Sequence, residues 1–156
     1  MVKTYDNVFV LRTFSKMLSI PALRLGVVIS SDKNIKCINN YKPHYTVNSI
    51  ALLFAEAIVE NHDKVISELR LQYEEGKKYV LKSLKDNGYE TLPSEGCYVA
   101  IKPKYKSSRE VTDRLEENGI LILCGKGGLT GWVRLTIAHK KYMEIFMKEL
   151  LEIDRE

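Results

Sequence analysis

Long hydrophobic runs are missing from this sequence of 156 residues, and their absence excludes several classes of protein. No stretch of about 18 apolar residues occurs, so the sequence predicts no membrane-spanning helix. The first residues, from Met1 to Asp6, also lack the apolar run of a secretion signal. The formal net charge is only +4 and the lysines are spread along the chain. This pattern favours a solvated surface over a nucleic-acid-binding face.

Cysteine and histidine are scarce, and neither residue type is arranged for metal binding. The cysteines are far apart and form no Cys-x-x-Cys pair, which argues against a disulfide framework or a zinc site and favours a reducing cytoplasm. We expect them to be buried small hydrophobic residues; they are Cys37, Cys97 and Cys124. The histidines lack metal-ligand spacing, so we predict no metal site and assign surface or capping roles to His44, His62 and His139.

The first part of the chain predicts two strands and a helix. The run Val-Phe-Val-Leu at residues 8–11 is typical of a strand buried on both faces, and residues 23–30 form a second β-rich run. Ser31 and Asp32 are suitable N-caps for a short helix that ends near residue 39. A parallel sheet covered on both faces needs further strands that the chain does not encode. We therefore expect that an upstream part of the domain is missing.

The rest of the chain predicts a long helical segment and then a small mixed module. Residues 47–87 have a helical pattern with a plausible break at residues 61–63, and Gly88 ends it. Beyond Gly88 the pattern indicates strands at residues 98–101, 120–123 and 132–138, and helices at residues 108–118 and 140–153. The predicted fold class is α/β to α+β, with a strand pair and a long helix followed by a βαββα domain. The domains are expected at residues 1–60, 61–87 and 88–156.

Lys16 is the first candidate for chemistry. A lysine after a strand is usually a solvated loop residue. Here Ser15 precedes it and Arg24 follows eight residues later. A lysine near apolar strand ends can be desolvated, which leaves its amine free to attack a carbonyl carbon. An arginine fork and a serine hydroxyl suit a phosphate group.

The segment that contains Lys16 resembles a known motif. Residues 13–26 read Thr-Phe-Ser-Lys-Met-Leu-Ser-Ile-Pro-Ala-Leu-Arg-Leu-Gly. This segment is similar to the Schiff-base motif of fold-type I, class I/II aminotransferases, and most similar to the histidinol-phosphate aminotransferase branch. The resemblance implies pyridoxal 5'-phosphate (PLP) as the cofactor and Lys16 as the catalytic residue that forms the Schiff base. It also implies that Ser15 and Arg24 bind the cofactor phosphate. Ala22 and Val27 depart from the common pattern.

A second segment, far away in the sequence, resembles the same family. Residues 131–138 read Gly-Trp-Val-Arg-Leu-Thr-Ile-Ala, similar to the late strand whose arginine binds the substrate carboxylate. Alternation along a strand places Val133 and Leu135 on one face and Arg134 on the other. The resemblance thus implies a substrate-binding role for Arg134. The glycine-rich stretch at residues 125–128, by contrast, lacks the spacing of a phosphate-binding loop and is interpreted as an ordinary loop.

The resemblance covers essentially the whole chain, but only the C-terminal part of such an enzyme. It implies amino-group transfer between an amino acid and a 2-oxo acid in cytoplasmic amino-acid biosynthesis, and a homodimer. In the family, the acid that pairs with the pyridine nitrogen and the ring-stacking aromatic residue lie upstream of the lysine. We therefore expect this chain alone to bind PLP weakly and to be inactive. Two alternatives stay open: a non-catalytic truncated domain with a structural or interaction role, and a PLP-dependent decarboxylase of the threonine-phosphate type.

Overall fold

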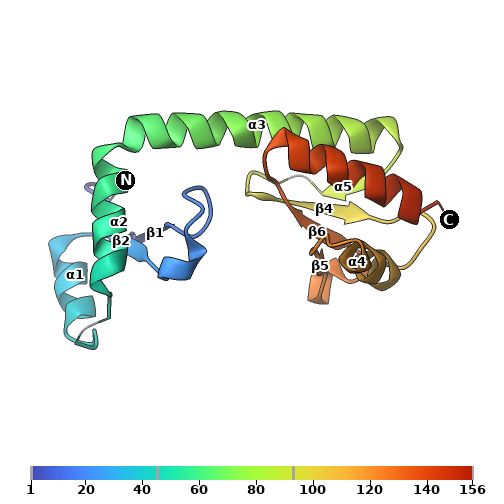
Figure 1. Cartoon of the computed structure of the whole chain (residues 1–156). Helices are drawn as coiled ribbons and strands as arrows, with labels where there is room; N and C mark the ends of the chain where they lie inside the picture. Colours follow the sequence, from blue (N-terminus) through green and yellow to red (C-terminus); the bar gives the residue numbers. More distant parts are fainter. Residues whose placement is uncertain (1, 45, 93, 156) are drawn as a thin grey trace. The chain divides into compact units, whose positions relative to one another are not determined.

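The structure is a computed structural model that describes residues 2–44, 46–92 and 94–155. The chain divides into two compact units, Met1–Leu69 and Arg70–Glu156. The long helix α3 (His62–Asp86) contributes its first residues to the first unit and the remainder to the second. The elements of each unit can be followed by their labels (Figure 1).

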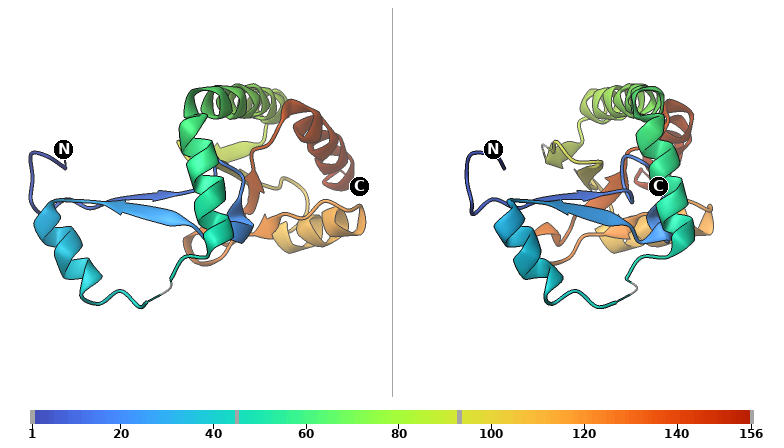
Figure 2. Two further views of the ribbon diagram at one scale, coloured as in Figure 1. Left: turned by 60° about the vertical axis from the view of Figure 1, so that its left-hand side comes forward. Right: turned by 90° about the vertical axis from the view of Figure 1, so that its left-hand side faces the viewer.

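The first unit contains a two-stranded antiparallel ribbon. Strand β1 (Val10–Thr13) pairs with β2 (Gly26–Ile29), and Val10 lies opposite Ile29. A loop with a short 3-10 turn, η1 (Pro21–Leu23), joins the two strands, and α1 (Asp32–Asn39) follows β2. The ribbon and the helix that continues from it are seen from two sides in Figure 2.

The two predicted strands exist, but their bounds, direction and burial differ from the prediction. The expected strands at residues 8–11 and 23–30 are Val10–Thr13 and Gly26–Ile29, and they run antiparallel. The apolar pattern predicts burial on both faces in a larger sheet, whereas in the described chain each strand pairs only with the other and their apolar side chains are exposed, as expected if further strands are missing. Leu11 is 74% exposed and Ile29 is 48% exposed. The strand pair itself is confirmed.

The helical segment breaks where the sequence indicates. Helix α2 (Ser49–Glu60) begins after Asn48, whose side-chain oxygen accepts a hydrogen bond from the Ala51 backbone N–H at 2.8 Å. This is an N-cap interaction that satisfies one of the free amides of the first turn. Helix α2 ends at Glu60 with Asn61 as its C-cap, and α3 begins directly after this residue at His62. The predicted break at residues 61–63 is thus confirmed.

The second unit is a four-stranded antiparallel sheet that packs against helices. The sheet order is β3 (Glu90–Leu92), β4 (Tyr98–Lys102), β6 (Val133–Thr136) and β5 (Leu123–Cys124). The helices are the second part of α3, α4 (Ser108–Glu117) and α5 (Lys140–Ile153). This arrangement confirms the predicted fold class and adds a short strand, β3, that the prediction lacked. The strand predicted at residues 120–123 exists, but it is shorter and lies further along the chain, since only Leu123 and Cys124 pair with β6.

One face of this sheet forms the core. The inward residues of β4 and β6 alternate along the strands and meet apolar residues from all three helices. The largest side chains that are almost fully buried are Phe146, Leu84, Ile101, Leu115 and Met147. Burying one such side chain stabilises a fold by about 1.5–3 kcal/mol. The core therefore fixes the position of the opposite face of the sheet, where Arg134 lies.

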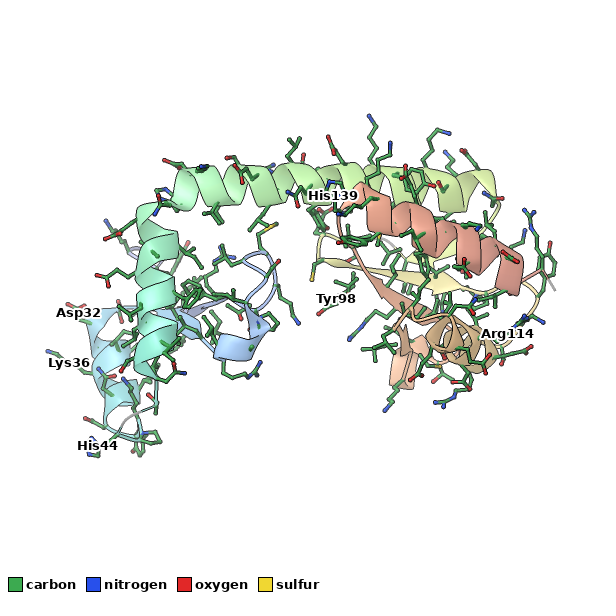
Figure 3. The ribbon with its side chains drawn as sticks, in the orientation of Figure 1. Asp32, Lys36, His44, Tyr98, Arg114 and His139 are labelled. Atoms are coloured by element: carbon green, nitrogen blue, oxygen red, sulfur yellow. The ribbon has the colours of Figure 1, made fainter. Side chains whose placement is uncertain are left out.

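The prediction for the cysteines is wrong, whereas the predicted capping role is confirmed for one histidine. Cys37 is exposed on α1, and Cys97 and Cys124 are only partly buried, so the prediction of buried cysteines is wrong. The capping role holds for His139, whose ring nitrogen accepts a hydrogen bond from the Lys141 backbone N–H at the start of α5 (Figure 3).

Within residues 2–44, 46–92 and 94–155, no cluster of three potential metal ligands occurs. No helix in those same ranges is long and apolar enough to cross a membrane.

Candidate active site

The loop that carries Lys16 is closed at its base by backbone hydrogen bonds. The Phe14 N–H donates to the Leu25 carbonyl at 3.2 Å, where β1 and β2 meet the loop. The Ile20 N–H donates to the Phe14 carbonyl, also at 3.2 Å. These bonds hold the residues between Phe14 and Leu25 as a compact projection from the ribbon.

Apolar side chains anchor the same loop on α2. Phe14 and Leu25 are buried at 8% and 7% exposure, and they pack with Ala51, which is fully buried on α2. Leu18 and Ile20 of the loop also pack against this cluster. The apolar residues of the motif therefore act as anchors, and the polar ones are left at the loop surface.

Ser15 and Lys16 follow directly after the anchor Phe14. The Ser15 backbone N–H donates to the Thr13 hydroxyl at 3.0 Å, and the Ser19 N–H donates to the Lys16 carbonyl at 2.9 Å. Ser15 is partly buried, whereas Lys16 is exposed. The desolvation considered for Lys16 is therefore not present in this chain. Its backbone, however, is held on both sides by hydrogen bonds of the loop.

Arg24 adopts a backbone conformation that the sequence did not indicate. Its φ and ψ are 51° and 37°, in the left-handed region that non-glycine residues rarely occupy. Ser19 in the same loop also has a positive φ of 55°. Such residues cost about 1–3 kcal/mol each and concentrate at functional sites. A glycine at either position would have signalled this turn, but the sequence has none there.

The Arg24 side chain keeps free donors although it contacts its own loop. Its Nη1 donates to the Pro21 carbonyl at 3.1 Å. A guanidinium has five N–H donors in a planar fork, so one such bond leaves several for an anion. The structure thus places a primary amine, a hydroxyl and a guanidinium on one anchored loop: Lys16, Ser15 and Arg24. This donor set can attack a carbonyl carbon and bind a phosphate.

Arg134 lies in the second unit, in the middle of strand β6. Its neighbours Val133 and Leu135 are buried at 0% and 3% exposure, whereas Arg134 is only partly buried and points to the opposite face. The predicted orientation of Arg134 is confirmed. The strand itself is shorter than the predicted residues 132–138 and covers Val133–Thr136.

Arg134 lines a pocket of about 280 Å³. The Arg134 guanidinium carbon lies 4.5 Å from the centre of the Tyr98 ring. Within the described part of the chain, no carboxylate forms an ion pair with Arg134. The residues that line the pocket with it are Leu92, Ser94, Tyr98, Ala100 and Leu129. A partly buried cation without a counter-charge, in mostly apolar surroundings, is suited to an anionic ligand.

The residue that follows the glycine-rich stretch, Leu129, lines this pocket, which the sequence did not predict. Residues 125–128 lie between β5 and β6, and the short turn η2 (Gly127–Leu129) brings Leu129 to the pocket wall. A Cβ atom on Gly125 would lie 2.1 Å from the Leu129 carbonyl oxygen. Gly125 is therefore required by this close approach of two backbone segments. Its role is structural, in keeping with the interpretation of an ordinary loop.

A family profile and a curated relative match nearly the whole chain, including the segments that contain Lys16 and Arg134. The profile of the family described as aminotransferase class I and II matches residues 1–150. A histidinol-phosphate aminotransferase of Thermotoga neapolitana is 31% identical over 151 residues, which are 96% of this chain and 43% of that protein.

Two solved structures show the same fold. The histidinol-phosphate aminotransferase of Clostridium acetobutylicum matches with a TM-score of 0.88 at 22% identity, over 99% of this chain and 48% of that chain. The enzyme of Sinorhizobium meliloti, solved in complex with pyridoxal-5'-phosphate, matches with a TM-score of 0.83 at 25% identity, over 97% of this chain and 42% of that chain. The chain therefore spans less than half the length of the relatives that it matches.

Proposed function

The chain belongs to the aminotransferase class I and II family, and from this we propose that the protein transfers an amino group between an amino acid and a 2-oxo acid with PLP as its cofactor. The observation that carries the proposal is the anchored loop between β1 and β2. It presents Lys16 beside Ser15 on a backbone held by Phe14 and Leu25, and it presents Arg24 in a strained conformation. Strain at a polar, exposed position is typical of a binding site.

The donor set of this loop fits the cofactor. PLP offers an aldehyde carbon for an amine and a phosphate for positive and hydroxyl donors. Lys16 would hold the cofactor covalently through its Nζ atom. Ser15 would donate its hydroxyl to the phosphate, and Arg24 would donate the N–H groups that its bond to the Pro21 carbonyl leaves over. When bound, PLP supplies an electron sink that stabilises negative charge on the carbon that loses a proton.

The protein residues then have two tasks in the transfer. Once the substrate amine has replaced it on the cofactor, the Lys16 amine would be free to act as the general base and acid that moves the proton of the substrate carbon. Arg134 binds the substrate carboxylate with its planar fork of donors, which fixes the substrate in one orientation. Transfer is favoured over decarboxylation because the relative with 31% identity is an aminotransferase of histidinol phosphate. A role in amino-acid biosynthesis forms part of the same proposal.

Association as a homodimer is also part of the proposal. Helix α2 is apolar on more than one side and is mostly exposed, a pattern that is typical of helices covered by another part of a protein. Its exposed apolar residues are Ile50, Leu52, Leu53, Phe54 and Val59. Sedimentation velocity over a wide concentration range should show reversible dimers. A monomer at every concentration would contradict this part of the proposal.

Absorbance of the chain with added PLP tests the role of Lys16. We expect a near-visible band that borohydride removes, with weak affinity and no turnover by these 156 residues alone. The Lys16→Ala variant should lose most of the borohydride-trapped cofactor. Lys36→Ala, which removes an exposed lysine of α1 in the same unit, should trap as much as the wild type. Equal trapping by wild type and Lys16→Ala would contradict the proposal and favour a non-catalytic domain.

A further inference from the structure

The sheet face around Arg134 has an unusual composition. Register places Leu92, Ala100, Arg134 and Leu123 in one row across the four strands. Arg134 is thus a single cation in an otherwise apolar row. Ala100, its direct partner on β4, is the smallest side chain of the row and is buried at 8% exposure.

Tyr98 stands diagonally across from Arg134. Tyr98 itself pairs with Thr136, two residues along β6. Diagonal neighbours on one face of an antiparallel pair lie roughly 7–8 Å apart, within reach of long and aromatic side chains. The Arg134 guanidinium carbon reaches the Tyr98 ring at 4.5 Å from its centre. Ala100 lines the same pocket as Tyr98 and Arg134, so a larger residue at this position would reduce the room beside the guanidinium.

From this arrangement we propose that Tyr98 is a positioning residue for Arg134, and that Ala100 provides the room for the contact. The inference rests on the proposed role of Arg134 in binding a carboxylate. The guanidinium lies over the Tyr98 ring, whose face attracts its positive charge, and the planar fork still has N–H donors available for an anion. The contact with the ring therefore restricts the rotation of the Arg134 side chain. Figure 3 shows Tyr98 on the sheet of the second unit, projecting from the side opposite α5.

The walls of the pocket indicate which anion it accepts. Leu92 and Leu129 stand on the pocket wall with the Tyr98 ring, and Gly125 fixes the backbone of Leu129 by its close approach. Arg134 is the only arginine or lysine among the described residues that line this pocket. The pocket therefore suits one anionic group attached to an apolar carbon, such as a carboxylate with its adjoining carbon atoms.

Nuclear magnetic resonance of the full chain tests this inference with propionate as the probe. The Arg134 Nε–Hε signal should be shifted by the Tyr98 ring and should move saturably when propionate is added. Tyr98→Phe keeps the ring and should retain both the shift and the affinity. Tyr98→Leu should lose the ring shift and bind propionate about two- to fivefold more weakly, as expected for one cation–π contact. Tyr105→Leu is the matched control, since Tyr105 is an exposed tyrosine of the same unit that also contacts a lysine.

Ala100→Val tests the same contact through the space beside Arg134. It should also reduce the shift of the Arg134 signal by the Tyr98 ring and the affinity for propionate. It keeps the inference testable if Tyr98→Leu fails to fold. An unchanged affinity in folded Tyr98→Leu, or no saturable propionate shift at Arg134 in the wild type, would overturn the inference. Trapping of PLP at Lys16 is measured on the other unit and does not depend on these variants. A negative result in the propionate experiment on Tyr98 can therefore be told apart from a negative result in the PLP-trapping experiment on Lys16.

Discussion

Asp154 offers the sharpest test of how the second unit is held together. It caps the C-terminus of α5 and is fully buried. Its carboxylate accepts backbone N–H groups from Lys104 at 2.8 Å, Tyr105 at 3.2 Å and Lys106 at 3.1 Å. One side chain thus joins the last helix to the loop between β4 and α4.

Replacing Asp154 by alanine leaves these three amides without their acceptor. A buried donor without a partner costs about 1–3 kcal/mol, and water that enters the vacated space recovers part of this. We expect Asp154→Ala to lower the free energy of unfolding by about 3–5 kcal/mol, as for other broken buried polar networks. For a unit of this size the midpoint of thermal unfolding should fall by at least about 10 °C. Asp154→Asn keeps one oxygen acceptor and should cost about 2 kcal/mol.

Tryptophan fluorescence reports the unfolding of the second unit, to which Asp154 belongs. Trp132 is the only tryptophan of the chain and lies in the second unit, next to β6. Urea unfolding followed by this signal should separate Asp154→Ala from the control Asp113→Ala. Asp113 pairs with Arg109 at the surface of α4, so its loss should change stability by less than about 0.5 kcal/mol. If the two variants unfold at the same urea concentration, the hydrogen bonds of Asp154 do not hold the unit together.

Three further predictions concern stability. Gly76→Ala should destabilise the second unit by about 1–3 kcal/mol despite the higher helix propensity of alanine, because a Cβ there would lie 1.9 Å from the Ala138 carbonyl oxygen; urea unfolding measures it. Burial, and then a hydrogen bond to a carboxylate, raises the pKa of Tyr89 above its ordinary value of 10.0. The associated stability is present below pH 10.0 and decreases as the pH rises above it; Tyr89→Phe should flatten this alkaline slope in unfolding curves. Asn48→Ala should lower the free energy of unfolding by about 1 kcal/mol, because it removes the N-cap hydrogen bond of α2. Ser31→Ala should change it little, since the Ser31 hydroxyl forms no capping hydrogen bond. Thermal unfolding followed by circular dichroism compares the two variants.

Local patterns predicted those parts of the fold that depend on local interactions. The alternation at residues 131–138 correctly placed the side chains of Arg134 and Val133 on different faces of the sheet, because the period of a strand fixes which side chains share a face. The break between α2 and α3 was visible in the polar residues around Asn61. The strand β3 was missed because Glu90–Leu92 is too short to show a period.

Other features depend on neighbours that a single segment does not reveal. Residues 120–123 are apolar like a strand, yet Leu121 is 78% exposed and only the end of the run pairs with β6. Cys37 is exposed because no element of the described first unit covers that side of α1. The left-handed conformation of Arg24 and the contact between Tyr98 and Arg134 arise from tertiary packing, so residue type alone did not predict them.

The lysine at which PLP is trapped shows whether the loop between β1 and β2 is a cofactor site. The chain is mixed with a limiting amount of PLP, reduced with borohydride, digested and mapped by mass spectrometry. Pyridoxal, which lacks the phosphate, is the matched control ligand. We expect PLP to label Lys16 before the other lysines, and we expect this preference to be lost with pyridoxal and in the Arg24→Ala variant. Equal labelling of Lys16 and other exposed lysines, or the same pattern with PLP and pyridoxal, would contradict it.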